Sequence, residues 1–429
     1  MKAAFYECDI TPPLGGHMPG YYRANPAEEV YERLFAKALV LEDNGTYAAI
    51  VAIDTCEYIE DMTKAVTDRV LEYTGIPYES ICIHATHTHK GAPIEDLPHV
   101  GQVADSAYRD VCFRLIADAI ILAHKRLDTA VAYFGCTRLE GFTFCRNYVR
   151  TDGKILTNTV ADGVFSHTLT TPDTRLPVLL IKRGETPIGA LFSFACHADA
   201  TDADMKGYTS DFPTIASDEL KRIYGQSFVS IYLAGASGDV NSRNPDKSIK
   251  RPPRYYKTIG QNLAQKVAEV IRTAQPVGNG ISVCKESIRI ERRQATEEYT
   301  EQMLARWQKA PGGMMRIRNL LYYQATNKAT HSELTMQVIC IGDTCLYVFP
   351  GEIFTDYAKQ IAEKTPYKNH FVITNCNSYG GYVPTKVAFS EHSDLYEIAL
   401  CYDSCLIPEA GEILTDRLLQ MGNRVNAYH

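Results

Sequence analysis

Apolar and polar positions along the chain follow two periods, which predict strands alternating with helices. Residues 36–54 form two β-rich runs joined by Asp43-Asn44-Gly45, a sequence that favours a tight hairpin turn. Residues 62–75 carry apolar side chains at helical spacing and end at a glycine suited to a C-cap. A short apolar run comes next, and we expect a buried strand over residues 80–89.

The same alternation continues, and no internal repeat is visible. Further helices are predicted near residues 105–126, 212–224 and 257–273, and further strands near 130–141, 176–184, 187–197, 228–239, 280–292 and 335–351. This pattern predicts an α/β fold with a large mixed β-sheet core flanked by helices, formed as a single domain by residues 1–429. Residues 295–326 form a predicted helical insertion, broken at Pro311-Gly312-Gly313, that is either a lid over a pocket or an ordinary packing hairpin.

Composition and charge narrow the classes of partner. The chain has 45% hydrophobic and 22% charged residues, as an ordinary globular protein does. Its net charge of -7, with the basic residues spread out, provides no footprint for nucleic acid or an anionic membrane. There is no apolar run of membrane-spanning length, no export signal and no CxxC spacing among the thirteen cysteines. We expect a cytoplasmic protein with a small-molecule substrate, no nucleic-acid partner and no stable membrane association; a homo-oligomer stays open.

The densest chemical signal is a group of three histidines in residues 84–91. His87 and His89 are two residues apart, so an extended chain would point both imidazoles to one face, toward one cation. A pair of hydrogen-bonded loop histidines would fit the same pattern. By the same parity His84 points the other way, and we expect it to lie in the core or to support the site.

Two further candidate ligands follow apolar runs. His197 lies where a buried strand gives way to a polar loop, which is where open α/β sheets carry functional groups. Catalytic zinc typically takes three protein ligands and a water molecule. Glu352 follows Pro350-Gly351 and could be a ligand or a general base. The helical spacing after it also fits a glutamate in a first helical turn, and the residue pattern alone slightly favours that interpretation.

Other polar motifs are less specific. Gly235-Ala236-Ser237-Gly238-Asp239 lacks one residue of the spacing that a nucleophile elbow requires, so a tight turn is the better interpretation of Ser237. Arg146 and Arg150 flank a tyrosine-containing segment. Either could bind a carboxylate, polarise a carbonyl or be a solvated surface charge.

The order of these clusters resembles the catalytic domain of the neutral/alkaline (non-lysosomal) ceramidase family. The segments that carry the resemblance span nearly the whole chain, in the family's order. They are residues 9–15 (DITPPLG), 20–21, 39–42, 85–91 (ATHTHKG), 194–197, 210–213, 235–241 (GASGDVN), 350–352, 379–385 (YGGYVPT) and 396–397.

The resemblance implies a set of roles for particular residues. It implies one zinc ion bound by His87, His197, Glu352 and Tyr382, and so favours Glu352 as a ligand over the helical interpretation. It also implies that His89 acts in hydrogen bonding or proton transfer and that Arg146 faces the substrate.

Three departures from the family pattern bear on the substrate. Asn241 stands where the ceramidases have a serine, and Lys90 replaces a usual serine, which would place a cation beside the metal loop and favour an anionic substrate. The chain also stops about where the family's C-terminal immunoglobulin-like domain would begin, so we expect no such domain. Ceramide, a membrane lipid, is therefore not the substrate we expect.

The sequence thus predicts a zinc-dependent amidohydrolase that cleaves linear N-acyl bonds in a small soluble substrate, with one Zn²⁺ ion per chain. We expect His89, Arg146 and Tyr382 to be catalytic, and Arg146, Lys90 and Asn241 to contact the substrate. The alternatives are a zinc hydrolase of esters, lactones or sugar derivatives, and a metal-dependent binding protein with altered catalysis.

Overall fold

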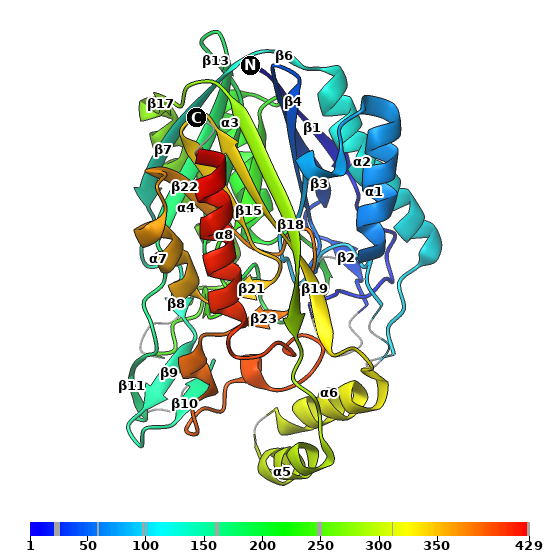
Figure 1. Ribbon diagram of the computed structural model, residues 1–429, viewed down its shortest axis with the longest axis vertical. Coiled ribbons are helices and arrows are strands. Elements are labelled where there is room, and N and C mark those ends of the chain that lie inside the picture. The colour runs from blue at the N-terminus through cyan, green and yellow to red at the C-terminus, as the bar shows by residue number, and fades with distance from the viewer. Residues whose placement is uncertain are drawn as a thin grey trace.

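Three parts of the chain fold with the same order of elements. The structure is a computed structural model that describes residues 1–20, 26–57, 60–96, 98, 101–158, 163–246, 251–310 and 312–426. Each part has three antiparallel strands, a helix, a fourth strand parallel to the third, and a second helix (Figure 1). We refer to these parts as the first, second and third units.

The bounds of the elements are as follows. The first unit contains β1 (Lys2–Asp9), β3 (Phe35–Asp43), β4 (Thr46–Ile53), α1 (Glu60–Thr74), β5 (Ile81–Ala85) and α2 (Ser106–Lys125). The second contains β7 (Val131–Arg138), β12 (Arg175–Arg183), β13 (Thr186–Phe194), α3 (Phe212–Tyr224), β15 (Val229–Ala234) and α4 (Tyr255–Thr273). The third contains β18 (Ile281–Glu291), β19 (His331–Ile341), β20 (Thr344–Val348), α7 (Thr355–Lys364), β22 (Asn369–Ile373) and α8 (Ala410–Asn426).

Shorter elements extend the sheet edges or connect the units. The short strands are β2 (Glu29–Val30), β6 (Asp128–Thr129), β8 (Phe144–Cys145), β9 (Asn147–Arg150), β10 (Ile155–Thr157), β11 (Phe165–Thr168), β14 (Gly207–Tyr208), β16 (Val240–Asn241), β17 (Gln275–Pro276), β21 (Glu352–Ile353) and β23 (Tyr382–Val383). The described 3-10 helices are Tyr78–Ser80, Lys386–Phe389 and Tyr396–Ile398.

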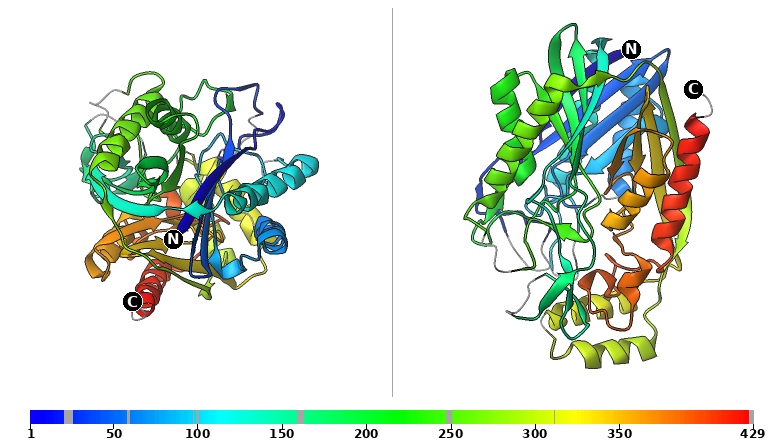
Figure 2. Two further views of the ribbon diagram at one scale, coloured as in Figure 1. Left: turned by 90° about the horizontal axis from the view of Figure 1, so that it is seen from above. Right: turned by 90° about the vertical axis from the view of Figure 1, so that its left-hand side faces the viewer.

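The three sheets face one shared apolar core. Leu41, Leu179 and Leu346 come from the first, second and third unit, and all three are fully buried in the same cluster. The outer faces are covered by α1 and α2, by α3 and α4, and by α7 and α8, respectively. Seen from above, these helix pairs point away from the centre in three directions (Figure 2). Strands buried on both faces read as continuous apolar runs, which is why the sequence indicated buried strands.

The predicted α/β class with mixed sheets is confirmed. The sheet core is divided into separate sheets of five, five and four strands, because each unit pairs its own strands. The predicted hairpin is also confirmed, since Asp43 pairs with Thr46 across the turn. Asn44 and Gly45 have φ angles of 49° and 82°, the left-handed conformation that a tight hairpin of this kind requires.

The predicted helical insertion forms two helices, α5 (Glu297–Trp307) and α6 (Gly313–Thr326), at one end of the molecule (Figure 1). Gly312 lies at the N-cap of α6, and Pro311 lies outside the described residues. Trp307, Leu320 and Tyr323 pack into the core of the third unit, as a packing hairpin would; a lid function stays a prediction. In the part of the chain that the structure describes, no helix is long and apolar enough to cross a membrane.

Candidate metal centre

The predicted metal ligands come together where the inner strands of all three units end. His87 follows β5 of the first unit, His197 follows β13 of the second, and Glu352 follows β20 of the third. Each of these strands belongs to a parallel pair within its own sheet. The three residues form a buried group whose candidate ligand atoms lie within 4.8 Å of one another.

The loop that carries His87 is not the strand that the sequence predicted. Strand β5 ends at Ala85, and His87 has a φ angle of 63°, in the left-handed region that costs a non-glycine residue on the order of 1 kcal/mol. The Asp54 carboxylate holds this loop by accepting hydrogen bonds from the hydroxyls of Thr86 (3.2 Å) and Ser210 (2.8 Å). The rings of His87 and His89 do lie 5.2 Å apart. They are brought together by a constrained turn, and not, as predicted, by lying two residues apart on the same face of a strand.

Backbone carbonyls orient both metal-site histidines. The Nδ1 atom of His87 donates to the Cys56 carbonyl at 2.8 Å, and that of His197 donates to the Ser237 carbonyl at 2.8 Å. In the neutral rings each Nε2 atom therefore carries a lone pair. These two Nε2 atoms lie 2.9 Å apart, and each is 3.2 Å from Oε2 of Glu352. Three lone pairs directed at one point repel one another unless a cation lies between them.

Glu352 is held so that one oxygen faces the histidines. Its Oε1 atom accepts a hydrogen bond from the Tyr379 hydroxyl at 3.1 Å, while the buried Oε2 atom faces the two Nε2 atoms and has no other hydrogen-bond donor among the described residues. The interpretation as a residue of a first helical turn is wrong, because Glu352 belongs to β21 and α7 begins at Thr355. The unpaired oxygen and the two imidazole lone pairs fit the N and O donors that zinc prefers.

The turn after β15 supports the Glu352 segment. A Cβ atom at Gly238 would lie 2.4 Å from the Glu352 carbonyl oxygen, so only glycine permits this approach. The side chain of Asp239 accepts hydrogen bonds from the backbone N–H (2.8 Å) and hydroxyl (2.7 Å) of Thr355. Ser237 contributes its carbonyl to His197, as the tight-turn interpretation allows, and its own hydroxyl is buried without a partner among the described residues.

Burial and mutual charge set the protonation of the site. Burial lowers the pKa of His87, but the Glu352 carboxylate outweighs this effect and the net pKa is raised. Burial lowers the pKa of His197 to about 4, with a contribution from the Arg146 charge. Burial also raises the pKa of Glu352, yet the two histidines hold it well below its usual range. Near neutral pH the site therefore presents a carboxylate and at least one neutral imidazole.

The fold was compared with those of solved structures, and two of the matches are ceramidases. The structure is similar to neutral ceramidase from Pseudomonas aeruginosa, with a TM-score of 0.71 and 17% identity over 99% of this chain and 75% of that chain. It is also similar to a structure described as ceramidase complexed with C2, with a TM-score of 0.71 and 16% identity over 100% of this chain and 75% of that chain. This chain has a neutral ceramidase-like fold. No family model and no curated protein sequence matches it.

Within this ceramidase-like fold, Tyr382 and Arg146 lie beside Glu352. Strand β21 pairs in parallel with β23, which places Tyr382 opposite Glu352. The buried Tyr382 hydroxyl is hydrogen-bonded to the Tyr396 hydroxyl, and the Arg146 guanidinium lies 5.5 and 5.1 Å from the centres of these two rings. Arg146 also donates to Glu397 at 2.9 Å. The structure thus brings both predicted residues to the site, and Tyr382 as a metal ligand stays a prediction.

Lys90 does not lie as its predicted substrate contact requires. Its side chain is buried, and its ammonium group donates to the backbone carbonyls of Asp202 (3.1 Å) and Met205. Burial lowers its pKa to about 8. Lys90 therefore fixes the loop after His197 from within the protein. The sequence could not indicate this, because residue type does not tell in which direction a loop lysine points.

The other predicted residues have these positions. His84 is fully buried, as the core interpretation predicted, and its Nε2 atom accepts the backbone N–H of Ala234 at 2.9 Å, which ties β5 to β15. The Asn241 side-chain carbonyl accepts the backbone N–H of Arg243 at 2.8 Å, so part of its hydrogen-bonding capacity serves the local turn. Arg150 forms an ion pair with Asp152 at 3.1 Å on the surface, as the solvated interpretation would have it.

Sequence reasoning missed Cys56 and Tyr379, which orient His87 and Glu352. Cys56 acts through its carbonyl, which every residue possesses, so no sequence signal could have found it. Tyr379 lies in the segment that carries the ceramidase resemblance, and that segment was the available signal.

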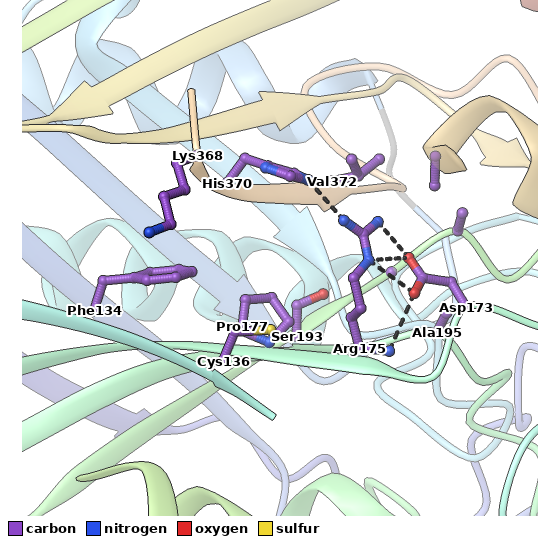
Figure 3. Close-up of a pocket in the computed structure, with 13 residues that line it drawn as sticks. Phe134, Cys136, Asp173, Arg175, Pro177, Ser193, Ala195, Lys368, His370 and Val372 are labelled. Atoms are coloured by element: carbon purple, nitrogen blue, oxygen red, sulfur yellow. Dashed lines mark hydrogen bonds and ion pairs between the residues drawn. The ribbon is translucent and has the colours of Figure 1, made fainter. Parts of the chain in front are cut away.

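A separate cavity of about 110 Å³ lies between the second and third units (Figure 3). Phe134, Arg175, Lys368 and His370 are among the residues that line it, and none of the predicted site residues does. The Arg175 guanidinium is already paired with Asp173 at 2.6 Å and contacts His370 at 2.7 Å. This cavity therefore offers no free guanidinium for a ligand.

Proposed function

We propose that the protein is a zinc-dependent amidohydrolase that cleaves linear N-acyl bonds in small soluble compounds. The observation that supports this proposal best is the convergence of two imidazole Nε2 atoms and one unpaired carboxylate oxygen in a buried site. His87, His197 and Glu352 would hold the ion, with Tyr382 as the fourth candidate ligand. Bound zinc would supply a Lewis acid that activates water and polarises the scissile carbonyl.

The surrounding residues are suited to moving a proton and stabilising charge. Burial lowers the pKa of His89 to about 3, opposed in part by Asp199, so this imidazole is neutral at pH 7 and has a free lone pair. We assign it the transfer of the proton from the attacking water to the leaving nitrogen. The C–O bond forms first, and the C–N bond then breaks as the leaving nitrogen takes up the proton; the water's hydroxyl remains on the acyl carbon.

Tyr382 and Arg146 provide the candidate oxyanion contacts. Burial raises the pKa of Tyr382 well above its usual range, so its hydroxyl keeps a proton that it can donate. The Arg146 guanidinium remains charged: its pKa is raised, because the nearby tyrosines and Glu397 outweigh the effect of burial. We assign these two groups the stabilisation of the negative charge that develops on the carbonyl oxygen.

Metal content of the purified protein, never exposed to chelator, tests this proposal first. We expect about one zinc ion per chain and turnover of members of a panel of N-acyl amides. A protein without stoichiometric metal would refute the metal site. A zinc-loaded protein that ligands stabilise but that turns over no amide or ester would instead be a binding protein.

A further inference from the structure

A buried ion pair with Glu397 holds the Arg146 side chain. The Glu397 Oε1 atom accepts a hydrogen bond from the Arg146 Nε atom at 2.9 Å, and the Arg146 Nη2 atom donates to the Gly238 carbonyl at 2.7 Å. Glu397 is fully buried and Arg146 is only 5% exposed. In the part of the chain that the structure describes, Arg146 is the one basic residue that forms an ion pair with Glu397. Because two of its nitrogens have separate acceptors, the plane of the guanidinium group is fixed.

Glu397 is itself held in place from several directions. The hydroxyl of Thr157, in β10, lies 2.9 Å from Oε1 and 3.0 Å from Oε2 of Glu397 and donates to this carboxylate. The Glu397 backbone carbonyl accepts a hydrogen bond from the Ser404 hydroxyl, and Arg293 donates to the adjoining Ile398 carbonyl at 2.9 Å. The carboxylate therefore has a fixed position from which it can set the position of Arg146.

The helical insertion contacts the segment that carries Glu397. Arg316, in α6, donates to the Asp394 carboxylate at 2.8 Å, and Arg306, in α5, donates to the Ser393 carbonyl at 2.6 Å. Asp394 lies three residues before Glu397 in the chain. The insertion thus supports, through two arginines, the segment that ends beside the candidate metal centre.

The same segment supplies the hydrogen-bond partner of Tyr382. Tyr396 directly precedes Glu397, and its hydroxyl is hydrogen-bonded to that of Tyr382. The centres of these two rings lie 5.4 Å apart, with their planes at 85°, and the Arg146 guanidinium lies within 5.5 Å of both centres. Two adjacent residues of the third unit therefore contact both of the groups to which we assign stabilisation of the oxyanion.

We propose that Glu397 is a positioning residue that directs the Arg146 guanidinium to the carbonyl oxygen of the substrate. This proposal rests on the proposed function, in which Arg146 stabilises the oxyanion. The Nε and Nη2 atoms donate to Glu397 and Gly238, so Nη1, which takes part in neither bond, is the nitrogen that donates to the oxyanion. Such a donor has to be placed to within about 0.5 Å, and an arginine without a fixed acceptor would adopt many rotamers.

Replacing Glu397 by leucine removes the acceptor and keeps most of the volume of the side chain. We expect the kcat of the zinc-loaded enzyme for an N-hexanoyl amide to fall by on the order of a hundredfold, since a displaced oxyanion donor costs about this factor. The KM should change by less than about threefold, because the contact is made in the transition state. Glu397→Gln, whose side-chain carbonyl can still accept from Nε, should restore most of the lost kcat. Glu391→Leu, the same substitution at an exposed position nearby in the chain, should leave kcat unchanged.

A double-mutant cycle tests whether Glu397 acts through Arg146. In an Arg146→Met background, Glu397→Leu should cause no further loss of kcat, because the group that Glu397 positions is absent. Should Glu397→Leu fail to fold, Glu397→Asp keeps the charge, withdraws the carboxylate by one methylene group and should lower kcat by about tenfold. An equal loss of kcat in both backgrounds, an unchanged kcat in folded Glu397→Leu, or a loss of bound zinc together with the activity would overturn the proposal.

Binding of hexanoate separates this proposal from the proposed function. Hexanoate is the carboxylate that hydrolysis of an N-hexanoyl amide releases, and its charged oxygens would take the place of the oxyanion. We expect calorimetry to show that Glu397→Leu weakens its binding to the zinc-loaded protein by about tenfold, and that the same substitution has no effect in the Arg146→Met background. Such binding without hydrolysis of any amide would support the positioning role and overturn the proposed function. Amide hydrolysis with hexanoate binding that Glu397→Leu does not weaken would overturn the positioning role alone, and a protein that neither hydrolyses amides nor binds hexanoate would overturn both.

Discussion

Replacing Glu352 by glutamine tests whether its carboxylate binds a metal ion, because the substitution removes the charge and keeps the shape of the side chain. The glutamine carbonyl can still accept the hydrogen bond from Tyr379, while its amide group would face the two histidine Nε2 atoms and donate to them. The apoprotein should therefore fold as well as the wild type. What is lost is one negative charge opposite the metal ion.

The size of the effect follows from the geometry. A carboxylate oxygen that ligates zinc lies about 2 Å from the ion, so replacing it by a neutral amide removes a charge attraction of at least about 5 kcal/mol at an effective dielectric constant of about 20. Since about 1.4 kcal/mol corresponds to a tenfold change, the metal affinity should fall by on the order of a thousandfold.

Competition with chelators of graded affinity measures this change, and thermal unfolding monitored by circular dichroism checks the fold. Glu291→Gln, which removes an exposed carboxylate at the end of β18, is the matched control and should bind metal as the wild type does. If Glu352→Gln kept wild-type affinity for zinc, our assignment of the buried Oε2 atom to the metal would be wrong.

Three further outcomes follow from the site. His87→Ala and His197→Ala should each lose bound zinc and activity, whereas Ser237→Ala should keep most of both, because only the Ser237 carbonyl contacts His197; elemental analysis and amide turnover check this. Lowering the pH from about 8 to about 5 should weaken metal binding, and the affinity should begin to fall above the ordinary histidine pKa of about 6.5, because the pKa of His87 in the metal-free site is raised and a proton competes for the same Nε2 atom; competition with a chelator across the pH series checks this. Lys90→Met should lower the free energy of unfolding by about 2 kcal/mol, because the buried carbonyl groups of Asp202 and Met205 lose their donor. The KM should stay near the wild-type value. Urea unfolding and steady-state kinetics check these two expectations.

Local signals in the sequence predicted local structure well. The predicted helix at residues 212–224 has the bounds of α3, and Asp105 caps α2 by accepting two backbone N–H groups. Such caps and helical spacings lie within a few residues of one another, so the sequence displays them directly. The division into three sheets was not visible, because strand pairing joins residues far apart in the chain and apolar runs do not specify their partners.

The candidate site was predictable only in part for the same reason. The strand through His89 was predicted from periodicity, but tertiary hydrogen bonds to Asp54 end it at Ala85. Glu352 fitted two interpretations until its pairing with Tyr382 placed it before the helix. The contacts that complete the site, such as the Cys56 carbonyl, are backbone interactions that residue identity does not encode.

The division into three units explains how three buried hydrogen-bond acceptors, two histidine nitrogens and one glutamate oxygen, can lie so close together. His87, His197 and Glu352 each belong to a different unit, so no unit contains the metal centre by itself. Docking the units through their shared apolar core forces the ligands together, at a cost in lone-pair repulsion that bound metal removes. Metal binding would therefore be coupled to the assembly of the units, and metal at about a thousand times its dissociation constant would stabilise that assembly by about 4 kcal/mol. Because this contribution is a sizeable fraction of the stability of a typical domain, a bound metal would hold the strand ends together as well as providing the proposed site of chemistry.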